Sequence, residues 1–117
     1  MTYEGDTSYS VYLAPCAQDD FDSLDGSTRQ AVVKQLEKLR HHPEAGRRCG
    51  NKAGLDLRDC RSLHFGGNRY RLVYRILLAD RRVRVLGIGK REGMEIYRMV
   101  AARLKTDAVT KDELTRD

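Results

Sequence analysis

The chain has 117 residues, of which 40% are hydrophobic and 33% are charged, and its formal net charge is +5. This length suits one domain around a single core, and the apolar content is too high for wholesale disorder. The sequence contains no run of about 20 apolar residues that could span a membrane, and its first residues lack the basic and hydrophobic regions of a secretory signal. We therefore expect a cytoplasmic protein with no membrane partner.

The first half of the sequence predicts a strand followed by a helical hairpin. Tyr9–Leu13 has strand composition, and Pro15 suits the first turn of a helix. Apolar residues then recur at helical spacing until Gly26 ends the pattern. Ser27 resembles the first residue of a capping box, and a second apolar stripe opposite charged residues continues from there to Leu39.

The second half predicts a three-stranded meander after a loop. His41–Asp56 contains a proline and three glycines without periodicity, which predicts a loop. Leu57–Phe65, Arg69–Ile76 and Arg82–Gly89 have strand patterns, and Gly66–Asn68 marks the first turn between them. We expect the glycines near the end of the third strand to weaken it.

Helical spacing returns from Glu92 to Leu104. The expected order is therefore β-α-α-β-β-β-α, a small α+β domain over residues 1–104. We expect its helices to pack on one face of a mostly antiparallel sheet, with the other face open. Residues 105–117 are polar and predict a flexible tail.

Basic residues concentrate in the predicted sheet, since half of the 22 lysines and arginines lie between Lys52 and Arg91. Alternation along the middle strand places Tyr70, Leu72, Tyr74 and Ile76 on one face, which predicts core. The opposite face carries Arg69, Arg71, Val73 and Arg75 and is partly cationic. A basic sheet face favours a polyanionic partner, although a merely solvated basic surface would have the same pattern.

The order of elements brings Arg71, Lys90 and Arg91 toward one end of the sheet, and Tyr97 follows on the first turns of the last helix. Cleavage of RNA by its own 2'-hydroxyl requires deprotonation of that hydroxyl, neutralisation of the phosphate and protonation of the leaving oxygen. Arginines suit the second task without a metal, because they match phosphate oxygens bidentately. The phenol of Tyr97 could stack on a base or transfer a proton. Spacing alone equally allows solvated arginines and a core tyrosine.

The cysteines do not indicate a metal or disulfide framework. Cys16, Cys49 and Cys60 are odd in number and have no CxxC spacing, so we expect reduced thiols, no metal and no cofactor. A cysteine nucleophile with His41, His42 or His64 stays open, but no spacing favours it over small buried side chains.

The stretches NRYRLVYRI (Asn68–Ile76) and VRVLGIGKREGMEIYRMVAARL (Val83–Leu104) resemble the RelE/ParE superfamily of toxins from type II toxin-antitoxin systems. The pattern YRLVY, a hairpin, GKRE and a tyrosine six residues after that arginine is closest to the RelE branch. This resemblance implies a ribosome-dependent endoribonuclease that cuts messenger RNA. It also implies a cognate antitoxin that wraps around the toxin in a hetero-oligomer.

When the residue roles of the family are carried over by position, the resemblance implies that Arg71, Arg91 and Tyr97 are catalytic. Well-known members have two lysines on the preceding strand where this chain has Ser62 and His64. His64 is a possible replacement, because its ordinary pKa lies near neutrality, and it could equally be an exposed strand residue. Further residues are expected to contact RNA: Lys52, Arg58, Arg61, Ser62, Arg69 and Lys90.

Two alternatives share the fold. The chain could be a ParE-like inhibitor of DNA gyrase without nuclease chemistry, although such inhibitors have little need for the arginine and tyrosine set. It could also be a member that binds RNA or antitoxin without cutting, which the replacement of both lysines keeps open.

Overall fold

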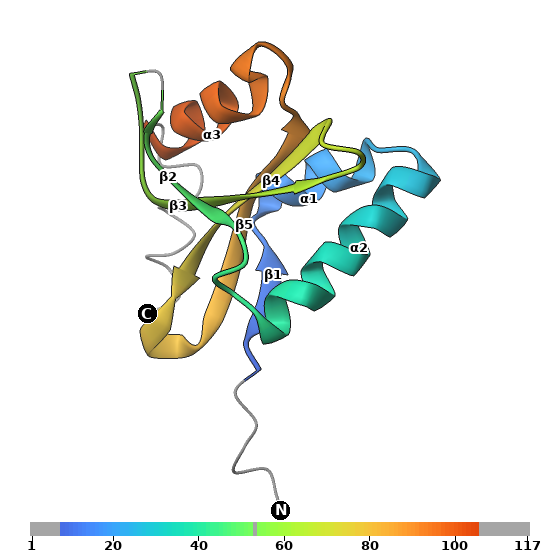
Figure 1. Cartoon of the computed structure of the whole chain (residues 1–117), viewed down its shortest axis with the longest axis vertical. Coiled ribbons are helices and arrows are strands. Elements are labelled where there is room, and N and C mark those ends of the chain that lie inside the picture. The colour runs from blue at the N-terminus through green and yellow to red at the C-terminus, as the bar shows by residue number, and fades with distance from the viewer. Residues whose placement is uncertain (1–7, 53, 106–117) are drawn as a thin grey trace, which may run out of the picture.

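The structure is a computed structural model that describes residues 8–52 and 54–105 (Figure 1). Its helices and strands are β1 (Ser10–Leu13), α1 (Pro15–Asp22), α2 (Gly26–His41), β2 (Arg47–Lys52), β3 (Leu55–Phe65), β4 (Tyr70–Leu77), β5 (Arg82–Lys90) and α3 (Glu95–Lys105). Short 3-10 turns, Leu78–Asp80 and Glu92–Met94, precede β5 and α3. None of the helices in these ranges is long and apolar enough to cross a membrane.

The strands form one mixed sheet in the order β1-β5-β4-β3-β2. The neighbours β2 to β5 pair antiparallel, and β1 pairs in parallel with β5 at the edge. Along the chain, the α1–α2 hairpin follows β1 and precedes the other four strands, as the sequence predicted. The predicted α+β class is therefore confirmed.

The loop predicted over His41–Asp56 is partly wrong, because β2 lies inside it. Arg47–Lys52 lacks the alternation of a strand, so the sequence carries no periodic signal there. The segment is extended because its backbone pairs with β3, in a ladder whose register shifts between Arg48 and Gly50. Long-range pairing, rather than local preference, makes this strand.

The helix boundaries also differ from the prediction. Helix α1 ends at Asp22, before Gly26, and Gly26 instead begins α2. The cap of α2 is Asp25 rather than Ser27, because the Asp25 carboxylate accepts a 2.7 Å hydrogen bond from the backbone N–H of Thr28. This hydrogen bond, together with one from the Ser27 hydroxyl, holds the pKa of Asp25 below its ordinary value.

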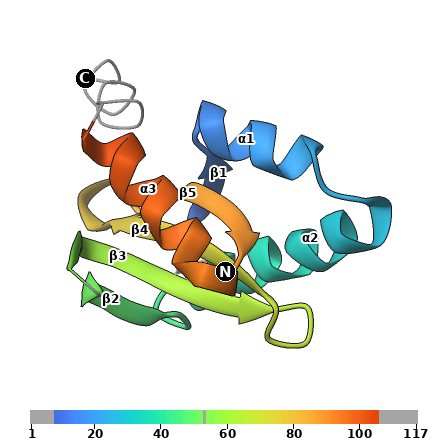
Figure 2. The same ribbon diagram turned by 90° about the horizontal axis from the view of Figure 1, so that it is seen from above.

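Both faces of the sheet are covered, so the expected open face is wrong. Leu72, Val73 and Tyr74 are consecutive and fully buried, although their side chains alternate between the two faces. Helix α3 contacts β3, β4 and β5 and covers the face that carries Val73 (Figure 2). On the opposite face, the Tyr74 hydroxyl donates a 2.6 Å hydrogen bond to the Pro43 carbonyl, just after α2.

The glycines of β5 make room for α3 instead of ending the strand. A Cβ atom built on Gly87 would come within 2.7 Å of Val100, and one built on Gly89 would be 3.4 Å from Ile96. Strand β5 continues past both glycines to Lys90. The predicted tail lies outside the described residues from position 106 onward, and the boundary at 104 stays a prediction.

An ion pair connects helix α1 with helix α3. The guanidinium of Arg103 on α3 donates to both carboxylate oxygens of Asp20 on α1, at 2.8 and 2.9 Å. Asp20 also accepts a hydrogen bond from the Ile88 backbone N–H, and Arg103 donates to the Leu86 carbonyl. The hydrogen bonds to Asp20 raise the pKa of Arg103. These contacts hold α1 and α3 together against β5.

Candidate functional site

A pocket of about 420 Å³ lies where β2, β3 and β4 meet the start of α3. It contains all four residues that the sequence singled out as catalytic candidates, and its lining is Arg47, Arg48, Cys49, Ser62, His64, Arg71, Arg91, Met94 and Tyr97. Four of these residues are arginines, and among the described lining residues none is acidic. The pocket is therefore suited to an anionic ligand.

Strand register explains why residues distant in sequence meet here. His64 pairs with Arg71 across the β3–β4 ladder, and Arg71 in turn faces Gly89 of β5. Directly paired residues of antiparallel strands have side chains on the same face of the sheet. His64 and Arg71 therefore share the α3 side with Ser62, which pairs with Arg47 on β2.

Arg71 is held rigidly at the pocket. Its side chain is only 7% exposed, and its Nη1 donates to the backbone carbonyls of Asn68 and Tyr70 at 3.0 and 3.1 Å. Its Nε is buried and has no hydrogen-bond partner in the described structure. A buried charged donor without a partner is costly, so its presence beside a pocket indicates a place for an anion.

Tyr97 and Ser62 form a buried pair at the same pocket. Their hydroxyl oxygens are 3.0 Å apart, and the two residues are 4% and 5% exposed. Tyr97 lies on the first turns of α3, as predicted, but almost none of its ring is available for stacking on a base. In this structure the Tyr97 hydroxyl holds Ser62 in position on β3.

His64 and Arg91 are exposed residues of the lining, in contrast to Arg71. The backbone N–H of Arg91 donates to the Arg69 carbonyl at 3.0 Å, which anchors the backbone at the end of β5. Their side chains can therefore approach a ligand from solvent, while the backbone stays fixed by the sheet. The pocket therefore combines the immobilised guanidinium of Arg71 with the exposed guanidinium of Arg91 and the exposed imidazole of His64.

The remaining predicted RNA-binding residues are divided among other places. Arg69 and Lys90 line an adjacent hollow of about 520 Å³, which shares Arg91 with the first pocket. Arg58 and Arg61 do not line either of these; they line a third hollow elsewhere on the sheet. The side chain of Lys52 lies outside the described part of the chain.

Three lining residues were not candidates from the sequence, namely Arg47, Arg48 and Met94. Arg47 and Arg48 belong to β2, which was predicted as loop, and their adjacent positive charges were the one visible signal; Met94 ends the 3-10 turn before α3. Cys49 and His64 line the same pocket, and Cys16, Cys49 and Cys60 form no disulfide with one another. Across residues 8–52 and 54–105 there is no group of three or more His, Cys, Asp or Glu side chains that could hold a metal ion.

Comparison with known proteins agrees with this architecture. The profile of a family described as the ParE toxin of type II toxin-antitoxin systems, parDE, matches residues 11–94. The chain therefore belongs to the RelE/ParE superfamily of type II toxin-antitoxin toxins.

Several of the similar proteins are RelE toxins. A RelE-like toxin protein of Escherichia coli is 26% identical over 100 residues, covering 83% of this chain and 98% of the relative. A double mutant of E. coli RelE in the free state superimposes with a TM-score of 0.67 at 25% identity, over 83% of this chain and 98% of that one. The toxin-antitoxin complex RelBE2 of Mycobacterium tuberculosis gives a TM-score of 0.62 at 27% identity, over 72% and 99%.

Proposed function

We propose that this toxin is a ribosome-dependent endoribonuclease that inhibits translation by cutting messenger RNA. The proposal rests on one observation: Arg71, Arg91 and His64 line the same pocket, and no acidic residue is among the described residues that line it. The RelE-like relatives, similar over most of the chain, support the same class of activity.

The chemistry needs no metal. The 2'-oxygen of a nucleotide loses its proton to a base and attacks the adjacent phosphorus, while the bond from phosphorus to the 5'-oxygen breaks. That leaving oxygen takes a proton from an acid. The products are a 2',3'-cyclic phosphate and a 5'-hydroxyl, and no water is consumed.

Arg71 and Arg91 are suited to stabilise the phosphate in the transition state. Arg71 is preorganised, since two backbone carbonyls fix its Nη1 and leave the Nε without a partner. Preorganised donors of this kind each contribute about 10²- to 10³-fold in rate. Arg47 and Arg48 add positive charge to the same pocket, from strand β2.

His64 is our candidate for proton transfer, because it is the one imidazole among the lining residues and it is exposed next to Arg71 in the ladder. Imidazole is the side chain best suited to both accepting and donating protons in this role. Tyr97 acts through Ser62 as a positioning residue, since its hydroxyl is buried against the Ser62 hydroxyl.

The proposed partners are the ribosome with its bound messenger, and a cognate antitoxin. Several similar structures were solved as toxin-antitoxin complexes, including RelBE2. The hollow with Arg69 and Lys90 adjoins the catalytic pocket through Arg91, so these cations are placed to contact the RNA backbone on one side of the cut.

The test is cleavage of a defined messenger in a purified translation system, with and without ribosomes, read by primer extension. We expect discrete cuts that require ribosomes, and losses of about 10²-fold or more for Arg71→Ala, Arg91→Ala and His64→Ala. Tyr97→Phe keeps the ring and should lose less. Lys34→Ala, an exposed change on α2, is the matched control and should cut like wild type. Absence of cuts from the folded wild type would refute the proposal.

A second candidate is inhibition of DNA gyrase, because the matching family profile is that of ParE toxins. A toxin of that kind would block supercoiling by purified gyrase, and the Arg71→Ala change would leave the inhibition intact. A member that binds RNA without cutting would retain ribosome binding but give no primer-extension stops.

A further inference from the structure

Cys49 is a thiol that the proposed cleavage chemistry does not use, although it lines the same pocket as Arg71 and Arg91. Arg47, two residues earlier on β2, pairs with Ser62 across the β2–β3 ladder. Residues two apart along a strand share a face of the sheet, so Cys49 lies on the α3 side with Arg47. Because Cys49 lines the pocket and is partly exposed, a small molecule that enters the pocket can reach it.

The surroundings of Cys49 are positively charged. Besides Arg71 and Arg91, the pocket is lined by Arg47 and Arg48, which immediately precede the cysteine, and none of its described lining residues is acidic. Reactive cysteines lie in electropositive, partly exposed surroundings of this kind, since the thiolate is the attacking species. The same positive charges attract reagents that carry carboxylates.

An independent observation, at Arg71, points to an anionic ligand in the pocket. Arg71 is 7% exposed, and its Nε is buried without a hydrogen-bond partner in the described structure. Burial of such a donor is costly, and a carboxylate of a bound molecule supplies the missing acceptor. The volume of the pocket, about 420 Å³, lies within the range of about 300–1,000 Å³ that is typical of small-molecule sites.

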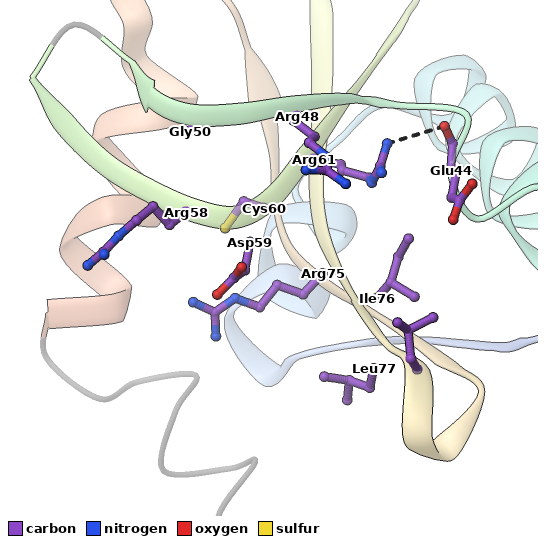
Figure 3. Close-up of a pocket in the computed structure, with 11 residues that line it drawn as sticks. Glu44, Arg48, Gly50, Arg58, Asp59, Cys60, Arg61, Arg75, Ile76 and Leu77 are labelled. Atoms are coloured by element: carbon purple, nitrogen blue, oxygen red, sulfur yellow. Dashed lines mark hydrogen bonds between the residues drawn. The ribbon is translucent and has the colours of Figure 1, made fainter.

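Cys60 serves as an internal control, because it is buried. It is 1% exposed, although it lines the third hollow, of about 640 Å³. Figure 3 shows that hollow, in which Glu44 and Asp59 place carboxylates among the arginines. Burial and mixed charge both predict that a small anionic reagent reacts slowly with Cys60.

Cys16 on α1 is a second control, because it is partly exposed like Cys49 but has different neighbours. Its thiol donates to the Leu86 carbonyl oxygen at 3.8 Å. The guanidinium of Arg103 donates to the same carbonyl and is paired with Asp20, so its positive charge is balanced. Cys16 therefore separates the effect of exposure from the effect of the arginines that line the pocket.

We propose that Cys49 is a site of thiol–disulfide exchange with small anionic disulfides such as glutathione disulfide. The Cys49 thiolate attacks one sulfur of the disulfide, a bond forms between these two sulfurs, and the original S–S bond breaks. The departing half takes the electron pair and a proton and leaves as a thiol. Cys49 is thereby oxidised to a mixed disulfide, and the carboxylates of the attached group pair with the arginines of the pocket.

The mixed disulfide occupies the space in which the phosphate of the messenger binds in the proposed reaction. Cleavage therefore stops until a reductant removes the attached group. This consequence rests on the proposed function, whereas the exchange at Cys49 does not.

The first experiment maps the exchange on the wild-type full chain. The reduced protein is treated with glutathione disulfide for increasing times, and the adduct at each cysteine is quantified by mass spectrometry of its peptides. We expect Cys49 to react at least about tenfold faster than Cys16 and Cys60, as charge-steered encounters do. Added salt should reduce this advantage, because it screens the arginines. Equal rates at Cys49 and Cys16, or faster reaction at Cys16, would overturn the inference.

The second experiment tests the role of charge with cystamine, a cationic disulfide. The ratio of the glutathione disulfide rate to the cystamine rate at Cys49 is divided by the same ratio for a short neutral cysteine peptide, which cancels the intrinsic reactivity of the reagents. We expect a normalised ratio of at least about ten, which falls in Arg47→Ala. Lys34→Ala removes an exposed charge on α2 and is the matched control, with the wild-type ratio. A normalised ratio near one in the wild type refutes the attraction of anions.

The third experiment measures messenger cleavage after the toxin has been treated with glutathione disulfide and freed of the reagent. Wild-type cleavage should fall at least about tenfold and return with dithiothreitol, because the attached group excludes the phosphate from the arginines. Treated Cys49→Ser should cut at its own untreated rate, and an equal loss in this variant would contradict inhibition through Cys49. If the untreated wild type cuts no messenger, the proposed function fails, while the adduct map still decides the exchange.

Discussion

Replacing Gly87 with alanine would test how tightly α3 packs against the sheet. A Cβ atom at this position would lie 2.7 Å from Cγ2 of Val100 and 3.2 Å from Cδ1 of Ile96. Ordinary carbon contacts are about 3.5 Å or more, so Gly87→Ala requires α3 or β5 to move by about 0.8 Å. Val100 and Ile96 are fully buried, so neither side chain has free space to enter.

We expect Gly87→Ala to destabilise the fold by about 2 kcal/mol, in the middle of the usual range for overpacking. At about 4–8 °C per kcal/mol, this lowers Tm by about 10 °C. Gly89 is the matched control, since its Cβ would be 3.4 Å from Ile96, which is ordinary contact. Gly89→Ala should be neutral, or stabilising by up to about 1 kcal/mol, because alanine restricts the unfolded chain.

Urea unfolding followed by circular dichroism measures both variants against wild type, with equal m-values as the check that the comparison is valid. Two results would refute the packing argument: a Gly87→Ala stability within about 0.5 kcal/mol of wild type, or an equal loss in Gly89→Ala. Because α3 carries Tyr97, we also expect Gly87→Ala to disturb the pocket.

Three further predictions concern contacts that hold the site in place. Tyr74→Phe removes the partner of the Gly46 N–H and the Pro43 carbonyl, so it should cost about 1–3 kcal/mol in urea unfolding; an unchanged midpoint would contradict this. Burial raises the pKa of Tyr74 above its ordinary value of 10.0, so its stabilising effect is complete below pH 10 and is lost as pH rises through the folded-state pKa. Wild-type stability should accordingly fall above about pH 10 with a steeper slope than in Tyr74→Phe, measured as unfolding free energy against pH. Asp20→Asn leaves Arg103 without its counter-ion and should lower the free energy of unfolding by about 2–3 kcal/mol. In a double-mutant cycle with Arg103→Met, the two changes should not be additive, and additive losses would refute the role of the pair.

Local sequence patterns predicted most of the elements correctly. Apolar spacing identified α1, α2 and α3, and alternation with a Gly-Gly-Asn turn identified β3 and β4. These patterns depend on neighbours within a few residues along the chain, which a sequence displays directly. The same patterns placed Arg71 on β4 and Tyr97 at the start of α3, which proved to line one pocket.

The sequence by itself thus determined the α+β class, the order of most elements and the identity of the cationic residues. Only the tertiary structure decided that β2 is a strand, because its extended form depends on pairing with β3 rather than on its own residues. The structure also shows that Arg58 lies in a different hollow from Arg71, because β3 pairs with β4 over Arg61–Phe65 and Arg58 precedes that stretch. The sequence could not predict that Tyr97 is buried against Ser62, because contacts between residues far apart in the chain leave no periodic signal in a single sequence.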